Sequence, residues 1–246
     1  MRLEGKTALI TGGASGFGAG IARKFEAEGA RVMIADIDPE AVEAMAGVLG
    51  VASVVADVSR DDGVAHMALA AQAALGPLDI LVNNAGVTHL PAALEEVTEE
   101  DFDRVLRVNA KSVYLTARHL VPAMKARRAG VILNMASTAA LSPRPRLSWY
   151  NASKGWMVTA TKGMAVELAP FGVRVNALCP VAGETPLLKS FLGEDTPATR
   201  AKFLATIPLG RFSTPQDLGN AAAFLCSDEA AMLTGVALEV DGGRCV

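Results

Sequence analysis

Short apolar runs alternate with helical stretches along the whole chain, and this alternation is the feature that most constrains the fold. Each run is rich in Val, Ile, Leu and Ala, and most lead through a turn into a stretch with helical spacing of apolar residues. Strands separated by helices favour a parallel sheet that is covered on both faces. The sequence therefore predicts an α/β fold with a doubly wound parallel sheet. The predicted strands span residues 6–11, 31–36, 52–56, 78–82, 130–135, 173–178 and 236–240, and the longest predicted helices span residues 60–75, 98–124 and 148–169.

The size and charge of the chain exclude several classes of protein. Its 246 residues, half of them apolar, supply ample material for the core of one domain over residues 1–246. The net charge is -3 with interspersed signs, which argues against nucleic acid as a partner. No stretch is long and apolar enough to cross a bilayer, and the first residues lack the apolar run of a signal peptide. We therefore expect a cytoplasmic protein with no membrane partner.

The cysteines give no sign of a disulfide framework or a metal site. Cys179, Cys226 and Cys245 are far apart and odd in number. Each is expected to be a small buried apolar residue, as free cysteines often are. The sequence predicts no metal.

A glycine-rich segment lies between the first predicted strand and the helix that follows it. Its pattern is Gly12-x-x-x-Gly16-x-Gly18, which differs from the general G-x-G-x-x-G fingerprint. Glycines in such a turn let backbone N–H groups approach a pyrophosphate at the N-terminus of a helix. A flexible loop is the alternative. The strand before the segment and the amphipathic helix after it favour phosphate binding.

The second predicted strand ends in a carboxylate, Asp36, where it can bond the hydroxyls of an adenosine ribose. That carboxylate would repel a 2′-phosphate, and neither Ile37 nor the glycine-rich segment supplies an Arg or Lys to receive one. The pattern therefore predicts NAD and not NADP. Helix capping is the alternative for Asp36, although Asp38 is the better cap candidate. Asp57, at the end of the third strand, can reach an adenine or cap the next helix, and its spacing leaves both open.

Small and polar residues follow the fourth predicted strand. The run Asn83-Asn84-Ala85-Gly86 lies where an α/β sheet places its ligands, and it leaves room for a nicotinamide riboside. His89, in the loop beyond, is expected to be solvated. Asn109 lies within the helix that Thr98 begins. It is either a satisfied buried amide or part of a helix irregularity that offers a backbone carbonyl to water.

Two segments later in the chain are predicted to face a substrate. The loop Pro143-Arg144-Pro145-Arg146 is stiff and basic. Its arginines are expected to be solvated, with contact to an anionic substrate as the alternative. Residues 181–209 are apolar, helical in places and broken by prolines, which suits a lid that closes over a substrate. A mainly apolar pocket is indicated by Leu141, Trp149, Leu187, Leu188 and Phe191.

Tyr150 and Lys154 are four residues apart in a predicted helix, so they lie one turn apart on one face. A free phenol loses its proton near pH ~10. A nearby ammonium lowers that pKa, so the pair can donate and accept a proton near neutral pH. Ser137, at the end of the fifth strand, would lie at the same edge of the sheet as the glycine-rich segment. A surface lysine beside a helical tyrosine is the alternative.

Taken in order, these motifs resemble the short-chain dehydrogenase/reductase family. The resemblance covers Lys6 to about Gly243 and implies a single-domain Rossmann fold with helices on both faces of the sheet. It rests on Thr11-Gly12-x-x-x-Gly16-x-Gly18, Asn83-Asn84-Ala85-Gly86, Asn109, Ser137 and Tyr150-x-x-x-Lys154.

The resemblance implies a catalytic tetrad of Asn109, Ser137, Tyr150 and Lys154. Tyr150 would be the general acid/base on the substrate oxygen, and Ser137 would bond that same oxygen. Lys154 would lower the pKa of Tyr150 and hold the nicotinamide ribose. Asn109 would anchor a water that relays protons from Lys154.

The family also implies cofactor contacts and an assembly. Asp57 and Val58 would hold the adenine, Asn83 the adenosine side and Thr185 the carboxamide. Many members are homotetramers that meet through the helices after Thr98 and after Tyr150. The predicted NAD-binding residues are Gly12, Ser15, Gly16, Phe17, Gly18, Asp36, Ile37, Asp57, Val58, Asn83, Ala85, Gly86, Tyr150, Lys154, Pro180, Gly183 and Thr185. Where the family often has Pro-Gly, this chain has Pro180-Val181-Ala182-Gly183, which leaves the contacts of Val181 and Gly183 open.

The sequence thus predicts an NAD-dependent oxidoreductase that transfers hydride between the nicotinamide and a small secondary alcohol or ketone. A 3-oxoacyl-thioester reductase of the acyl-carrier-protein type is the alternative enzyme, although the lack of a 2′-phosphate site disfavours an NADPH-driven role. A non-catalytic dinucleotide-binding scaffold is the alternative of another class, and the complete tetrad disfavours it. Nucleotide-sugar epimerases share the Tyr-x-x-x-Lys pair but usually need a longer C-terminal domain.

Overall fold

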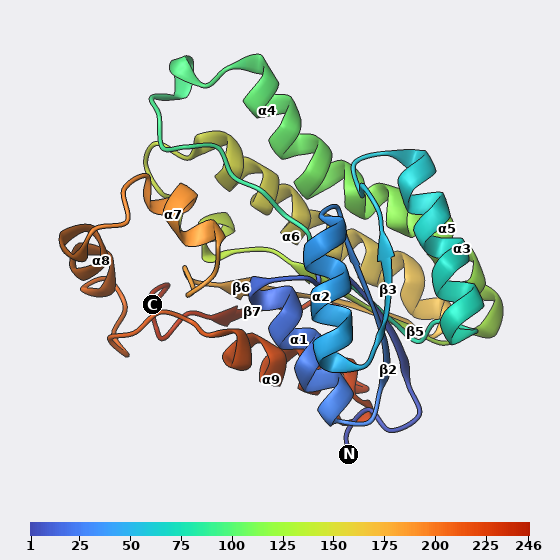
Figure 1. Cartoon of the computed structure of the whole chain (residues 1–246). Coiled ribbons are helices and arrows are strands. Elements are labelled where there is room, and N and C mark those ends of the chain that lie inside the picture. The colour runs from blue at the N-terminus through green and yellow to red at the C-terminus, as the bar shows by residue number, and fades with distance from the viewer.

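The computed structural model describes all residues from 1 to 246, and its centre is a seven-stranded sheet (Figure 1). The strand order is β3-β2-β1-β4-β5-β6-β7, and every neighbouring pair is parallel. The predicted doubly wound parallel sheet is confirmed. The strands are β1 (Thr7–Thr11), β2 (Arg31–Asp36), β3 (Ala52–Val55), β4 (Ile80–Asn83), β5 (Gly130–Met135), β6 (Val173–Pro180) and β7 (Ala237–Val240).

Helices cover both faces of this sheet, and neighbouring strand residues pack to opposite sides. In β1, Ile10 belongs to the core under α1, α2 and α9, whereas Leu9 belongs to the core under α3, α5 and α6. This two-sided burial explains why the strands are continuous apolar runs and not alternating ones. The helices are α1 (Gly16–Ala27), α2 (Pro39–Leu49), α3 (Asp61–Leu75), α4 (Glu99–Leu106), α5 (Ser112–Arg127), α6 (Ser148–Leu168), α7 (Leu187–Leu192), α8 (Pro197–Leu204) and α9 (Pro215–Cys226).

The long helix predicted over residues 98–124 is interrupted. A π-helical turn over Arg107–Lys111 separates α4 from α5, and Asn109 lies within it. Such turns insert an extra residue and are frequent at functional sites. The helix irregularity that the sequence left open is therefore present. Thr98 begins α4 as predicted, because its hydroxyl accepts a hydrogen bond from the backbone N–H of Asp101.

The order in which strands are added to the sheet reverses at β1, which lies between β2 and β4. The chain adds β2 and β3 on one side of β1 and then returns to add β4 on the other side. The loops that follow β1 and β4 therefore diverge. A crevice at such a point, outside the carboxyl ends of the strands, is where open α/β sheets bind ligands. The glycine-rich segment, Asp36, Asn84 and Ser137 all follow carboxyl ends of these strands.

The cysteines, the metal-ligating side chains and the apolar character of the helices can be checked directly in the structure. All three cysteines are unpaired; Cys179 and Cys226 are buried as predicted, whereas Cys245 is only half-buried, contrary to the prediction. Burial raises the pKa of the Cys226 thiol to about 12. No group of three or more His, Cys, Asp and Glu side chains is placed to hold a metal ion. None of the helices combines the length and the apolar character needed to cross a bilayer.

Candidate active site

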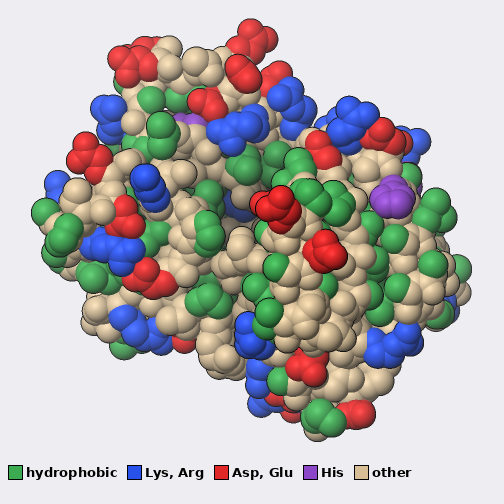
Figure 2. All heavy atoms as spheres, in the orientation of Figure 1, with side chains coloured by type: hydrophobic (Ala, Val, Ile, Leu, Met, Phe, Trp, Pro, Cys, Tyr) green, Lys and Arg blue, Asp and Glu red, His purple; other side chains and the backbone are tan.

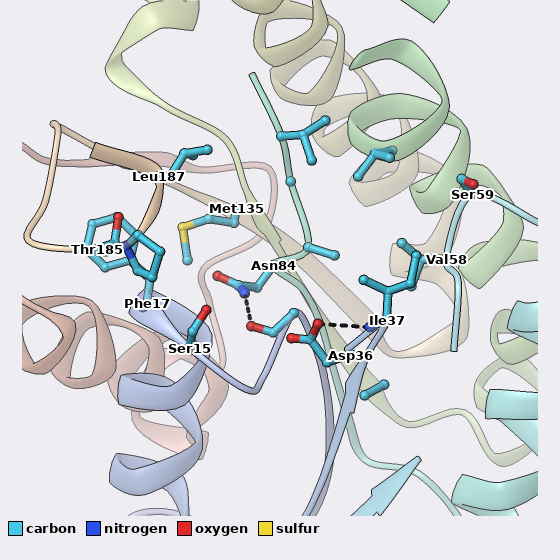
Figure 3. A pocket seen from close by; sticks show the side chains of 18 of the residues that line it. Ser15, Phe17, Asp36, Ile37, Val58, Ser59, Asn84, Met135, Thr185 and Leu187 are labelled. Carbon is cyan, nitrogen blue, oxygen red and sulfur yellow. Dashed lines mark hydrogen bonds between the residues drawn. The ribbon is translucent and has the colours of Figure 1, made fainter. Parts of the chain in front are cut away.

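A cavity of about 650 Å³ opens at the carboxyl edge of the sheet. The face in Figure 2 is hollowed near its centre, and Figure 3 shows the side chains that line the hollow. Its walls come from the glycine-rich segment, the ends of β2 and β3, the loop after β4, helix α6 and the segment before α7. The volume lies within the roughly 300–1,000 Å³ range of small-molecule and cofactor sites.

The glycine-rich segment is pressed against the end of β4. Gly12 and Gly16 have positive φ values of 62° and 52°, which only glycine adopts without strain. A Cβ on Gly12 would lie 2.8 Å from the Cα of Ala85. The side-chain amide of Asn84 donates to the carbonyl oxygens of Thr11 and Gly12, each at 2.9 Å (Figure 3). The loop thus leaves the N-terminus of α1 open toward the cavity, as phosphate binding requires.

Asp36 faces the cavity at the end of β2 (Figure 3). Its carboxylate accepts hydrogen bonds from the backbone N–H groups of Ala14 at 3.1 Å and Ile37 at 2.8 Å, so it is fixed between the glycine-rich segment and the strand end. The Ile37 side chain is exposed at the rim and carries no charge. Arg104 and Arg107 also line the cavity, but each forms an ion pair with an aspartate of α4.

Most of the predicted cofactor-binding residues line this one cavity. They are Gly12, Ser15, Gly16, Phe17, Asp36, Ile37, Asp57, Val58, Ala85, Gly86, Tyr150, Lys154, Pro180 and Thr185. Asp57 serves a local role as well, because its carboxylate accepts a hydrogen bond from the backbone N–H of Ser59. This bond lies in the turn before α3, whose N-cap residue is Arg60, so Asp57 does not cap the next helix as the alternative required.

Asn83 does not line the cavity, contrary to the prediction that it contacts the adenosine side. Its side chain is buried and donates to Asn134 Oδ1 at 2.9 Å, while its Oδ1 accepts from Thr116 Oγ1 at 2.9 Å. Successive residues of a strand point to opposite sides. The neighbouring Asn84, which the prediction omitted, therefore faces the cavity in its place.

Gly18 and Gly183 also lie outside the cavity wall, and both act through close packing. A Cβ on Gly18 would lie 2.0 Å from the carbonyl oxygen of Gly12, so glycine is needed where α1 meets the loop. A Cβ on Gly183 would lie 2.3 Å from the Phe17 ring. The shifted glycine of this loop thus makes room for Phe17, and the nearby Val181 packs into an apolar cluster with Leu188 and Phe203.

Tyr150 and Lys154 are both buried at the floor of the cavity, on the same face of α6. Lys154 is 4% exposed, and its Nζ donates to the carbonyl oxygen of Met135 at 2.7 Å. Burial lowers the pKa of Lys154 to about 8. Burial also raises the pKa of Tyr150, and a hydrogen bond with Ser137 works in the opposite direction. The predicted lowering of the Tyr150 pKa by Lys154 is absent here, because Nζ is 5.9 Å from the ring centroid and bonded elsewhere.

The side chains of Asn109 and Lys154 both lie close to the backbone of Gly86. A Cβ on Gly86 would lie 3.3 Å from Lys154 Nζ and 3.4 Å from Asn109 Oδ1. Asn109 is fully buried, and its amide bonds both the N–H and the carbonyl of Val87 and donates to Ser153 Oγ at 3.0 Å. It is therefore a satisfied buried amide within an irregular helix, and the backbone carbonyl that the irregularity would offer to water stays a prediction.

Two expectations about loop residues are wrong. His89 is not solvated but 1% exposed: its Nδ1 lies 2.8 Å from the carbonyl oxygen of Leu90, and its Nε2 has no hydrogen-bond partner. Arg144 is not solvated either, because its guanidinium lies over the rings of Phe191 and Phe203. Arg146 is exposed, as expected. The position of the Arg144 side chain depends on Phe191 and Phe203, which come later in the chain. The sequence around Arg144 does not predict these contacts.

Comparisons with known proteins agree with this geometry. A family model described as enoyl-(acyl carrier protein) reductase matches residues 12–244. The 4-formylbenzenesulfonate dehydrogenase of Comamonas testosteroni is 49% identical, with 99% of each chain covered. A 2-(S)-hydroxypropyl-CoM dehydrogenase of Xanthobacter autotrophicus is 37% identical and covers 98% of this chain and 97% of its own.

A solved structure gives the same result in three dimensions. The 3-ketoacyl-(acyl-carrier-protein) reductase of Brucella melitensis, crystallised with NADH, is 52% identical and superposes with a TM-score of 0.94 over 99% of this chain and 100% of its own. The fold, the cavity and these relatives lead to one conclusion. The chain belongs to the short-chain dehydrogenase/reductase family of oxidoreductases.

Proposed function

We propose that this enzyme is an NAD(H)-dependent dehydrogenase that interconverts an alcohol and its carbonyl compound, with Tyr150 as the proton-transferring group. One observation carries the proposal: the buried Tyr150 and Lys154 line the same cavity as the glycine-rich segment and Asp36. A cofactor site and an acid/base pair in one cavity are what hydride transfer to a carbonyl requires. A scaffold protein would need only the first of them.

The cavity fits a dinucleotide along its length. The open N-terminus of α1 suits the pyrophosphate, the carboxylate of Asp36 suits the ribose hydroxyls, and Val58 offers an apolar surface to the adenine. No unpaired cation stands beside Asp36 to receive a 2′-phosphate. When bound, the nicotinamide supplies or accepts the hydride. The relative of known structure that was crystallised with NADH supports the same choice.

The side chains around Tyr150 handle the proton. The phenol donates to the carbonyl oxygen during reduction and takes the proton back during oxidation. Ser137, at the end of β5, bonds the same oxygen as charge develops on it. Lys154, held by the carbonyl oxygen of Met135, lines the cavity beside Tyr150, where it can bind the hydroxyls of the nicotinamide ribose. Asn109, beside Gly86 and Lys154, completes the route by which a water can return the proton.

The substrate is proposed to be a small ketone or aldehyde. The relative from Comamonas testosteroni is named for 4-formylbenzenesulfonate, an aldehyde that carries a sulfonate. Reduction of a 3-oxoacyl thioester is the second candidate, because the 52% identical relative carries that activity in its name. Both substrates present a carbonyl oxygen to Tyr150, so they differ in what the outer cavity recognises and not in the proton chemistry.

Initial rates with NADH and NADPH test the proposal. The panel contains benzaldehyde, aromatic aldehydes with an acid group, small ketones and a 3-oxoacyl thioester. We expect turnover of a free carbonyl compound with a clear preference for NADH. Turnover of the thioester alone would promote the second candidate. Tight NADH binding without turnover of any compound in the panel would favour the alternative of a non-catalytic dinucleotide-binding scaffold.

Asp36→Ala is the sharpest variant for the cofactor preference. Loss of a hydrogen bond to a charged group is worth roughly 1.5–3 kcal/mol, so the NADH over NADPH ratio of kcat/KM should fall about tenfold or more. Asp38→Ala is the matched control, because Asp38 caps α2 through the N–H groups of Glu40 and Ala41 and does not line the cavity. An unchanged ratio in Asp36→Ala would refute the role of this carboxylate.

We further propose a homotetramer that works in the cytoplasm. The apolar side chains Tyr114 on α5 and Trp156 and Val166 on α6 are exposed in the single chain. Burial of such a surface in an assembly would remove it from water. Analytical ultracentrifugation gives the mass directly, and a monomer would contradict the proposal.

A further inference from the structure

A row of aromatic rings leads away from Tyr150 into the segment that covers the substrate side of the cavity. The ring of Tyr150 lies 5.9 Å from that of Phe191 on α7, and Phe191 lies 6.0 Å from Phe203 on α8. Phe203 in turn stacks on Phe212 at 5.8 Å. Tyr150 is thus connected, ring by ring, to residues far away in the sequence.

Arg144 lies against this row. Its guanidinium carbon is 4.8 Å from the ring centroid of Phe191 and 5.0 Å from that of Phe203. Phe191 therefore contacts both Arg144 and Tyr150. Of the five N–H donors that a guanidinium carries, one is used within the protein, at 3.0 Å to the carbonyl oxygen of Phe191. No carboxylate lies within ion-pair distance of Arg144, and burial lowers the pKa of its guanidinium.

A second arginine stands nearby. The guanidinium carbon of Arg244 is 5.3 Å from the ring of Phe203, and its Nε donates to Thr206 Oγ1 at 3.2 Å. It has no carboxylate partner either, and it acts on Arg144 as a like charge. Other arginines of this region are neutralised. Arg200, which lies over Phe212, pairs with both Asp195 and Glu184.

The loop that carries Arg144 is fixed relative to the catalytic tyrosine. Asn151, the residue after Tyr150, is buried, and its side chain donates to the carbonyl oxygen of Arg144 at 2.8 Å. Pro143 and Pro145 flank the arginine and restrict its backbone. The backbone of Arg144 is thus restrained next to α6, and its guanidinium is held by Phe191 and Phe203, which suits recognition of a remote group on a substrate.

We propose that Arg144, assisted by Arg244, binds an anionic group at the end of the substrate that is remote from its reacting carbonyl. The group is a carboxylate or a sulfonate on a small organic acid. Because Arg144 and Tyr150 both lie against the ring of Phe191, the best substrates carry the acid group and the carbonyl about one aromatic ring apart. Two partly buried cations without carboxylates are costly alone and become favourable when an anion joins them. This inference rests on the proposed alcohol and carbonyl chemistry.

Matched substrates and variants test the assignment. KM and kcat are measured for benzaldehyde, 4-formylbenzoate and 4-formylbenzenesulfonate with NADH. In Arg144→Met, KM for both acids should rise about tenfold or more, since charge-assisted hydrogen bonds are lost, whereas KM for benzaldehyde stays within about threefold. Arg144→Lys should recover part of the loss, because it keeps the charge but not the planar fork. Arg244→Met should show the same selectivity with a smaller rise.

Arg146→Met is the control, because Arg146 lies in the same loop and is exposed. It should leave all three substrates unchanged. An equal loss for benzaldehyde and the acids in Arg144→Met would assign the arginine a structural role over the phenylalanines and overturn the proposal. A wild-type enzyme that does not prefer the acids over benzaldehyde would overturn it as well.

A binding measurement separates this inference from the proposed function. Benzenesulfonate is titrated into the NADH-loaded protein by calorimetry, which needs no turnover. Binding to the wild type that is weakened about tenfold in Arg144→Met would support the anion site even if no carbonyl is reduced. No binding to the wild type would refute the site. A 3-oxoacyl-pantetheine phosphate is the last arm: if Arg144→Met affects that compound alone, the anion belongs to a carrier and the proposal of a small acid is wrong.

Discussion

The cofactor side and the substrate side of the cavity are built in different ways. On the cofactor side, the glycine-rich segment, Asp36 and Asn84 are held by hydrogen bonds to the backbone of neighbouring strand ends. On the substrate side, aromatic rings and arginines from α7, α8 and the loop before α6 hold each other through side-chain contacts. Contacts to the backbone are kept in proteins that share a fold, whereas contacts between side chains change when either residue is substituted. The first side therefore serves a ligand common to a family, and the second can be fitted to a particular substrate.

Tyr150→Phe removes the group on which both sides converge and should have the largest effect. The change deletes one hydroxyl and keeps the ring that packs on Phe191. We expect kcat to fall by about 10²- to 10⁴-fold, the usual contribution of a positioned acid/base group. NADH affinity should stay within about threefold, because the ring is kept and every other predicted cofactor-binding residue is unchanged.

Tyr114→Phe is the control for this change, since Tyr114 is the other tyrosine and is exposed on α5. Steady-state kinetics and a fluorescence titration with NADH measure the two effects separately. Near-normal turnover of a folded Tyr150→Phe protein would show that another group moves the proton.

Gly18→Ala tests whether the cofactor side depends on backbone packing. The new Cβ would lie 2.0 Å from the carbonyl oxygen of Gly12 and 2.5 Å from Asn84 Nδ2, so the loop must shift. Overpacking of this kind typically costs about 1–3 kcal/mol in the free energy of unfolding, and NADH binding should weaken with it.

Gly47→Ala gives the contrast within the same half of the molecule. Gly47 lies inside α2, and a Cβ there meets nothing within 4 Å. Alanine in a helix interior is favoured over glycine, so the free energy of unfolding should rise by about 0.5–1 kcal/mol with NADH binding unchanged. Urea titrations of both variants would contradict the comparison if Gly18→Ala were as stable as the wild type.

The difference between the cofactor side and the substrate side also explains which features could be predicted from the sequence. Strand ends, the glycine-rich segment and Asp36 are fixed by local pattern and by the parallel sheet, and the structure brings them together as expected. The sequence predicted that Asn83 faces the cavity, whereas Asn84 does so. Side chains of adjacent residues in an extended segment point to opposite sides, so only one of the two can face the cavity. Predicting which one needed the exact end of β4, and boundaries are the least reliable part of a sequence prediction.

The substrate side was predicted less well, for a physical reason. Arg144 and His89 were both expected in water, yet one lies on two phenylalanine rings and the other is buried. The rings over Arg144 belong to Phe191 and Phe203, about 50 to 60 residues later in the chain, and no local pattern encodes such contacts. The pKa of Tyr150 is a similar case. Sequence spacing placed Lys154 beside the phenol but gave no measure of how strongly burial opposes its ionisation.

Lys154 stands where the two sides meet, and its titration should change stability by a similarly small amount. Burial lowers its pKa to about 8 in the folded protein, from an unfolded value of 10.5. Below pH 8 both states carry the proton, and the folded state bears the cost of a buried charge. Above it, the folded state releases the proton before the unfolded state does, so the unfolded state binds more protons and stability rises with pH.

The wild type should therefore gain stability relative to Lys154→Met as the pH is raised. Between about pH 7 and about pH 9 the difference in the free energy of unfolding should shift by about 1 kcal/mol in favour of the wild type, and titrations that both proteins share cancel. Lys162→Met, on the exposed side of α6, should show no such shift. Urea denaturation at the two pH values measures it. If the difference in the free energy of unfolding between wild type and Lys154→Met did not change with pH, water would have to reach Lys154. The floor of the cavity would then not be closed to solvent, which would contradict the contrast drawn with the substrate side.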